Sequence, residues 1–222
     1  MSRGPLAHRP VNPDKIGMRL GAIILAGGRS TRMGRPKESL PFRGDSLLGS
    51  LCTTLLGCTE VVVVVARDAA QPLPPLPEAV IRIADRRPGR GPLEGVATGL
   101  HWLATTNRFA DDDAAFVTAC DHPLLTAAAV RGLAAALGRH DAVMPRQDGG
   151  LQPLCAVYRL SVLRAVDRLG DDATAGPSRL AKAGAVLALD EADVRAFDPT
   201  LSCLRNVNTP AAYEALRQRP DA

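Results

Sequence analysis

Residues 20–37 read LGAIILAGGRSTRMGRPK, and the interpretation of the whole chain starts from this stretch. Its first seven residues are apolar or glycine, which is typical of a short strand buried on both faces of a sheet. Two glycines follow directly, so the strand is predicted to end in a turn. Basic and hydroxyl-bearing side chains then continue to Lys37, and we expect this loop to bind anions.

Segments with strand and helix patterns alternate along the rest of the chain. Residues 60–66 (EVVVVVA) are β-branched almost throughout and predict a second strand buried on both faces. Residues 92–103 place apolar side chains at helical spacing behind a proline, which favours the first turn of a helix. Further strands are predicted at 79–84, 114–119, 142–144, 154–158 and 185–189, and further helices at 46–56, 126–137 and after Pro210.

This alternation predicts an α/β fold. We expect a single-domain, Rossmann-like three-layer sandwich with a mostly parallel sheet and helices on both faces. A length of 222 residues suits one such domain, which we assign to residues 19–222. Residues 1–18 are polar, basic and rich in proline, so we interpret them as a disordered extension. A second hypothesis is that Met18 is the true start, which an intact mass covering residue 2 onward would refute.

The loop after the first strand carries the strongest chemical signal. Gly27 and Gly28 let a ligand approach the backbone, and consecutive N–H groups in such a turn bind anions. Arg32 and Lys37 add positive charge nearby. Lys37 is one of only three lysines in an arginine-rich chain, and its compact ammonium suits a triphosphate. An ordinary solvated turn is the alternative, but the position directly after a buried strand favours phosphate binding.

Two common nucleotide-binding motifs are excluded by spacing. Five residues separate Gly28 from Gly34, and Gly34 is followed by Arg35, so this is not a Walker P-loop. The glycines do not form G-x-G-x-x-G either, which argues against a dinucleotide-dependent oxidoreductase.

A second signal follows the strand predicted at 114–119. Asp121 comes just after this strand, where a carboxylate can hold Mg²⁺ together with substrate phosphates. The alternative is that Asp121 is a turn residue capping the next helix. Cys120 is not interpreted as a nucleophile, because burial in the core explains it equally well. His122 is not needed as a general base, because an ionised phosphate needs none.

Composition narrows the class of protein further. The net charge is +4 and only 3% of residues are aromatic, which disfavours a nucleic-acid-binding surface. Five cysteines, with no C-x-x-C pair, favour neither a disulfide framework nor a zinc site. The apolar run 61–66 is too short to span a membrane, and the N-terminus lacks a secretory signal. We therefore expect a cytoplasmic protein.

Five segments in this order and spacing resemble the molybdenum cofactor guanylyltransferases: LAGGRSTRMGRPK, GPLEGVATGL, CDHP, QPLCAVY and NVNTP. These enzymes belong to the NTP transferases with a nucleotide-diphosphosugar-transferase-like fold. The resemblance runs from about Leu20 to the C-terminus, and the last two segments narrow it to the molybdopterin branch.

The resemblance implies a Mg²⁺-dependent transfer of GMP from GTP to molybdopterin, with release of pyrophosphate. It implies a nucleotide site formed by Leu25, Ala26, Gly27, Gly28, Lys37, Asp85 and Asp121. It further implies catalysis by Arg32, Lys37 and Asp121, metal binding by Asp121, and acceptor binding by Arg32, Asn206 and Asn208. No nucleic-acid or membrane partner is expected, and transient contact with molybdoenzymes or their chaperones is left open.

The sequence departs from the family pattern at two positions. Val64 stands about where family members often carry an asparagine that contacts the nucleotide, which weakens the inference of guanine selectivity. Glu94 replaces a small residue and is interpreted as a first-turn residue favoured by the helix dipole. The alternatives are a related transferase that uses CTP or another phosphorylated acceptor, and a non-catalytic nucleotide-binding protein. The joint presence of Lys37 and Asp121 argues against the second.

Overall fold

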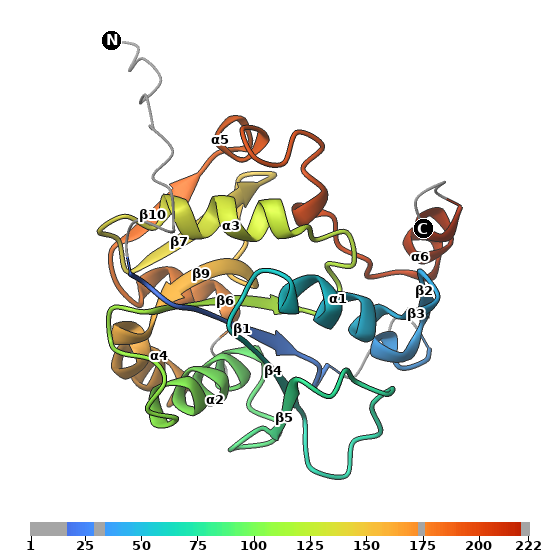
Figure 1. Cartoon of the computed structure of the whole chain (residues 1–222), viewed down its shortest axis with the longest axis horizontal. Helices are drawn as coiled ribbons and strands as arrows, with labels where there is room; N and C mark the ends of the chain where they lie inside the picture. Colours follow the sequence, from blue (N-terminus) through green and yellow to red (C-terminus); the bar gives the residue numbers. More distant parts are fainter. Residues whose placement is uncertain (1–16, 29–33, 173–175, 219–222) are drawn as a thin grey trace.

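The computed structural model describes residues 17–28, 34–172 and 176–218. The expectations for Arg32 and for nearly all of the N-terminal extension fall outside these ranges. A central sheet lies between two layers of helices, as the sequence predicts (Figure 1). Its strands are β1 (Leu20–Leu25), β4 (Val61–Ala66), β5 (Val80–Ala84), β6 (Ala114–Ala119), β7 (Ala142–Gln147), β8 (Gly150–Leu151), β9 (Cys155–Arg159) and β10 (Val186–Leu189).

The strand order is β10-β7-β9-β6-β1-β4-β5, with β8 paired to β7. Strands β5, β4, β1 and β6 pair in parallel, so their carboxyl ends lie along one edge. Strand β9 inserts antiparallel between β6 and β7, while β10 pairs in parallel with β7. The sheet is therefore mostly parallel, and the loops after β1, β4, β5 and β6 share the edge at which such sheets bind ligands.

Helices cover both faces of the sheet. Helices α1 (Leu47–Leu56), α3 (Ala127–Ala136) and α5 (Glu191–Arg195) pack on one face, and α2 (Pro92–Thr105) and α4 (Leu163–Gly170) pack on the other. The valines of β4 alternate between the two cores: Val62 and Val64 join the first, and Val63 and Val65 the second. Both faces of β4 are thus buried, as its β-branched run predicts.

Two glycines bring α2 close to β1. A Cβ placed on Gly99 would lie 2.5 Å from Ile23 Cγ2, and one on Gly95 would lie 3.0 Å from Leu25 Cδ2. The contact at Gly99 is shorter than van der Waals distance allows, so this packing requires glycine there, and the contact at Gly95 is tight. The N-terminal end of α2 is thereby held beside the carboxyl end of β1.

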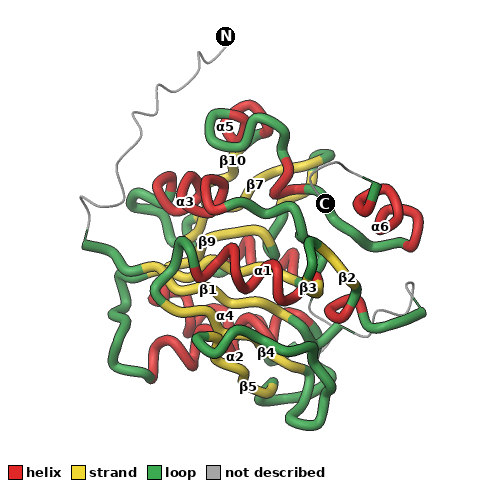
Figure 2. Tube along the Cα trace, turned by 45° about the vertical axis from the view of Figure 1, so that its right-hand side comes forward, coloured by secondary structure: helices red, strands yellow, loops and turns green. Residues whose placement is uncertain are grey.

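A small separate core joins the C-terminal helix to a hairpin that follows β1. Helix α6 (Pro210–Arg217) packs against the hairpin of β2 (Pro41–Phe42) and β3 (Asp45–Ser46). Tyr213 Oη donates a hydrogen bond to Pro41 O at 2.7 Å. Figure 2 shows α6 lying beside this hairpin, away from the central sheet. This packing places the segment before α6 next to the loop that follows β1.

In the described part of the chain, no helix is long and apolar enough to cross a membrane.

Candidate active site

A cleft of about 670 Å³ opens at the carboxyl edge of the sheet. This volume lies within the range of small-molecule sites. It is formed mainly by the ends of strands and the loops that follow them, together with the start of α2. The lining residues include Leu25 at the end of β1 with Gly27 and Gly28 after it, Val65 and Ala66 at the end of β4 with Arg67 and Asp68 after it, Asp85, Gly89 and Gly91 after β5, and Asp121 after β6.

The glycine loop forms one wall of this cleft. A Cβ on Gly27 would lie 3.1 Å from Arg67 N and Cα, so this glycine allows the ends of β1 and β4 to meet. Gly28 is exposed, and a Cβ there would meet nothing within 4 Å. Ala26 is buried, and its N–H donates to Val65 O at 2.9 Å. Leu25 and Gly27 therefore line the cleft on either side of Ala26, which instead borders a smaller adjoining cavity.

Asp121, which lines the cleft, meets Lys37 and Asn208 where the cleft adjoins the smaller cavity. Lys37 begins a short 3₁₀ helix (Lys37–Ser39), and its Nζ donates to Asn208 Oδ1 at 2.7 Å. The same Nζ lies 3.9 Å from Asp121 Oδ2. The backbone also ties these segments together, because Val207 N donates to Asp121 O at 2.8 Å. Asn206, two residues earlier than Asn208, is solvent-exposed.

Asp121 does not cap the following helix. Helix α3 is capped by Thr126, whose side chain accepts a hydrogen bond from Ala129 N at 3.1 Å. Asp121 instead lines the cleft together with Gly28 and Ala119. The capping interpretation is therefore excluded for this residue.

The carboxylate of Asp121 fits a divalent cation. Its Oδ1 atom is buried and has no hydrogen-bond partner among the described residues, which is costly for a charged group. Its Oδ2 atom faces Lys37. Among residues 17–28, 34–172 and 176–218, no group of three or more His, Cys, Asp or Glu side chains is placed to hold a metal ion. A magnesium ion, which usually takes one or two carboxylates plus substrate phosphates, suits this single donor.

The two neighbours of Asp121 are buried and structural. His122 is 2% exposed, and its Nδ1 lies 2.9 Å from Cys203 O, while its Nε2 lies 3.6 Å from Asp121 Oδ1. Burial lowers the pKa of His122, which favours the neutral ring. Burial likewise raises the pKa of the Cys120 thiol, which donates to Leu25 O at 3.2 Å. Neither residue has the environment of an activated nucleophile or base.

Asp85 lies at the other end of the cleft, directly after β5. Thr98 Oγ1 of α2 donates to Asp85 Oδ1 at 2.9 Å, and Asp85 N donates to Ala66 O at 2.8 Å. Burial raises the pKa of this carboxyl, and the Thr98 hydrogen bond opposes the rise. Asp85 and Asp121 thus mark opposite ends of a single cleft.

Val64, which stands about where relatives often carry an asparagine, does not line the cleft. Its side chain is fully buried in the core beneath α1 and α3, because it points to the opposite face of the sheet from Val65. The β4 residues that line the cleft are Val65 and Ala66, followed by Arg67. The Val64 side chain therefore does not contact the space inside the cleft.

Sequence reasoning missed Gln71, which fastens the loops around the cleft. This side chain is 3% exposed although it follows β4 in a proline-rich loop. Its Nε2 donates to Ala26 O at 2.8 Å and to Glu38 Oε1 at 3.0 Å, and its Oε1 accepts from Arg67 N at 2.6 Å. The partners lie up to 45 residues away, so no local pattern marks this residue.

A glycine-lined cleft with a lysine and a carboxylate at one end, on the carboxyl edge of a parallel sheet, defines an α/β protein that binds phosphorylated nucleotides. Residues 22–189 match the model of the MobA-like NTP transferase domain, and the chain belongs to this family of nucleotidyltransferases. The resemblance found from the sequence motifs is thereby confirmed.

Two relatives cover nearly the whole chain. A protein of Chloroflexus aggregans is 37% identical over 207 residues, which cover 88% of this chain and 92% of the relative. A protein of Mycobacterium tuberculosis is 38% identical over 211 residues, which cover 93% of this chain and 96% of the relative. Both are named "Probable molybdenum cofactor guanylyltransferase".

The fold has solved counterparts. The crystal structure of molybdopterin-guanine dinucleotide biosynthesis protein A from Archaeoglobus fulgidus superposes with a TM-score of 0.71 at 21% identity. The superposition covers 88% of this chain and 96% of that one. At this identity the likeness concerns the fold alone, and it confirms the expected α/β sandwich.

Proposed function

We propose that this protein is a molybdenum cofactor guanylyltransferase, which transfers GMP from GTP to molybdopterin or its molybdenum-bound form and releases pyrophosphate. The observation that carries the proposal is the position of Lys37 Nζ, which lies 2.7 Å from Asn208 Oδ1 and 3.9 Å from Oδ2 of Asp121, a residue that lines the glycine-lined cleft. The names of the relatives support the choice of GTP and molybdopterin as substrates.

We assign the phosphates and the base of the nucleotide to opposite ends of the cleft. The phosphates would lie against Gly27, Gly28 and Lys37, where backbone N–H groups and an ammonium favour negative charge. The guanine would lie toward Asp85, whose carboxylate can accept hydrogen bonds from the amino and imino groups of that base. We assign Arg32 to the phosphates and the acceptor on the strength of the family motif.

The reaction requires no covalent intermediate on the protein. A terminal phosphate oxygen of molybdopterin attacks the α-phosphorus of GTP, and the bond between that phosphorus and the bridging oxygen of the pyrophosphate breaks. Lys37 holds the triphosphate and offsets the charge that develops on its oxygens. Asn208 orients the ammonium of Lys37 through their 2.7 Å hydrogen bond, and we assign Asn206 to the acceptor side of the same segment.

We further propose that Asp121 holds Mg²⁺. The observation is its buried Oδ1 atom, which has no hydrogen-bond partner within the described residues. When bound there, Mg²⁺ would neutralise charge on the phosphate oxygens and so favour transfer. Pyrophosphate release should be lost in the presence of a chelator and restored by added Mg²⁺. Undiminished release with the chelator would refute the metal requirement.

The substrate assignment is tested by pyrophosphate release from purified protein, Mg²⁺ and molybdopterin, with GTP, CTP, ATP and UTP in separate reactions. We expect release with GTP only. Release with CTP instead would keep the site and the chemistry but refute the guanylyl assignment. No release with any of the four nucleotides would refute the proposed function, and a non-catalytic nucleotide-binding protein would then be the better account.

We place the reaction in the cytoplasm, where the five free cysteines stay reduced. We also propose that the product passes to molybdoenzymes or their chaperones through transient contact. Faster activation of an apo-molybdoenzyme by this protein than by free dinucleotide would support the contact, and equal rates would argue against it.

A further inference from the structure

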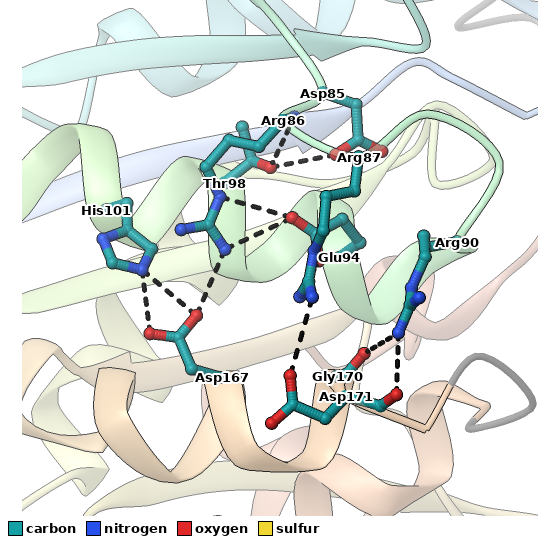
Figure 3. Close-up of polar contacts among 10 residues, drawn as sticks. All are labelled: Asp85, Arg86, Arg87, Arg90, Glu94, Thr98, His101, Asp167, Gly170 and Asp171. Atoms are coloured by element: carbon teal, nitrogen blue, oxygen red, sulfur yellow. Dashed lines mark hydrogen bonds and ion pairs between the residues drawn. The ribbon is translucent and has the colours of Figure 1, made fainter.

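The loop that follows β5 is held in place by ion pairs and hydrogen bonds of its own arginines. It reads DRRPGRG over residues 85–91 and lines the cleft with Asp85, Pro88, Gly89 and Gly91. Its three arginines do not line the cleft. Figure 3 shows them directed toward α2 and α4 instead.

Glu94 of α2 is the centre of this arrangement. Its side chain is only 1% exposed, and both of its oxygens are paired. Oε1 accepts from Arg86, with Nη2 at 3.2 Å and Nε at 3.3 Å, and Oε2 accepts from Arg87 Nε at 2.7 Å. The hydrogen bond to Glu94 raises the pKa of Arg87, as expected for a guanidinium held by a carboxylate.

Arg86 and Arg87 each pair with a second carboxylate that is more exposed than Glu94. Arg86 Nη2 lies 3.1 Å from Asp167 Oδ1, and Arg87 Nη1 lies 3.5 Å from Asp171 Oδ1. Asp167 also accepts from His101 Nε2 at 2.8 Å. These carboxylates are 36% and 77% exposed, so solvent weakens their pairing relative to that of Glu94.

The two ends of the loop are fastened as well. Thr98 Oγ1 donates to Asp85 Oδ1 at 2.9 Å and accepts from Arg86 N at 3.2 Å. Arg90 Nη2 donates to Gly170 O at 2.9 Å and to Asp171 O at 2.7 Å, at the carboxyl end of α4. The loop is therefore bound to α2 near its start and to the carboxyl end of α4 near its end.

This bracing matters because the middle of the loop is intrinsically soft. Gly89 and Gly91 have φ angles of 86° and 82°, and a Cβ on either would meet nothing within 4 Å. Glycines of this kind give up much conformational freedom when they are fixed. A buried carboxylate that holds two arginines of the same loop supplies the restraint that these glycines lack.

We propose that Glu94 is a positioning residue for the base end of the nucleotide. Through Arg86 and Arg87 it holds loop 85–91 so that Asp85 and the backbone of the two glycines meet the base in a fixed arrangement. This inference rests on the proposed function, and it assigns a role to the residue that departs from the family pattern. Glu94 lies in the first turn of α2, as the sequence predicts, and its ion pairs with Arg86 and Arg87 add a second role to that position.

The test is Glu94→Gln, which keeps the size of the side chain and removes its charge. We expect the KM for GTP and the Kd of GTP measured by calorimetry to rise about tenfold, with kcat within about threefold of wild type. The preference for GTP over ATP should fall by a similar factor. The matched control is Asp167→Asn, which removes an outer carboxylate from Arg86 and should change these constants less than twofold.

Amide hydrogen exchange separates positioning from general stability. In Glu94→Gln the amides of residues 86, 87 and 89–91 should exchange about tenfold faster, while those of β1 and β4 should stay unchanged. Unchanged KM and Kd for GTP in a folded variant would overturn the proposal, as would faster exchange throughout the sheet. If the wild-type protein releases no pyrophosphate from any NTP, the proposed function fails, but calorimetry and exchange still decide the role of Glu94.

Discussion

Replacing Gln71 with leucine should remove the hydrogen bonds that hold the loops of the cleft together. Leucine has a similar volume but makes no hydrogen bonds, so Ala26 O, Glu38 Oε1 and Arg67 N all lose the partner that Gln71 supplies. Each buried polar group left unpaired costs about 1–3 kcal/mol. Arg67 is half-buried, so water can take up part of the loss. We therefore expect the free energy of unfolding to fall by about 2–4 kcal/mol.

Urea unfolding monitored by circular dichroism measures this change directly, provided that the slope with denaturant stays constant. Gln218→Leu is the control, because Gln218 is exposed after α6 and its replacement should cost less than about 0.5 kcal/mol. The KM for GTP should also rise in Gln71→Leu, since the ends of β1 and β4 shift relative to each other. A loss of stability no larger than that of the control would refute the reasoning.

Three further predictions concern the phosphate end of the cleft. Asp121→Ala should abolish turnover while the unfolding curve stays close to that of wild type, and near-normal activity would exclude Asp121 as a metal ligand. Lys37→Ala should lower kcat/KM by about a hundredfold if the ammonium stabilises the transferring phosphates, and a loss below about threefold would mark a residue with no catalytic part. Burial lowers the pKa of His122, so the unfolded chain binds a proton more readily than the folded protein. The free energy of unfolding should therefore be highest above pH 6.5 and should fall as the pH drops below that value. The Tm of His122→Gln should be less sensitive to pH over that interval, and an equal pH dependence would contradict the assignment.

Much of the fold can be predicted because its signals are local. The β-branched run of β4 and the capping residues Ser46 and Thr126 each act within a few positions of the chain. The insertion of β9 between β6 and β7 cannot be read in this way, since strand order depends on pairings between distant segments. The face that a strand residue occupies is a related difficulty. A shift of one residue separates the core position Val64 from Val65, which lines the cleft.

The residues of the candidate site also differ in whether local sequence signals reveal them. Asp121 is marked by its place after a buried strand, and Gly27 by the paired glycines, so both can be found from the sequence. The partnership of Lys37 with Asn208 spans 171 residues and depends on the packing of α6 against the β2–β3 hairpin. Glu94 can be predicted only in part from the sequence. Its position in the first turn of a helix is visible there, but its pairing with the loop arginines is not.

The most direct test of the account follows the α-phosphorus of the nucleotide. Purified protein is incubated with Mg²⁺, molybdopterin and GTP radiolabelled at the α-phosphate, and the pterin product is separated from free nucleotide and pyrophosphate. The account predicts that the label appears in a pterin–guanine dinucleotide, in equal amount to the pyrophosphate released and with none retained on the protein. Label found on the protein, or pyrophosphate released without labelled pterin, would contradict direct transfer between the two substrates.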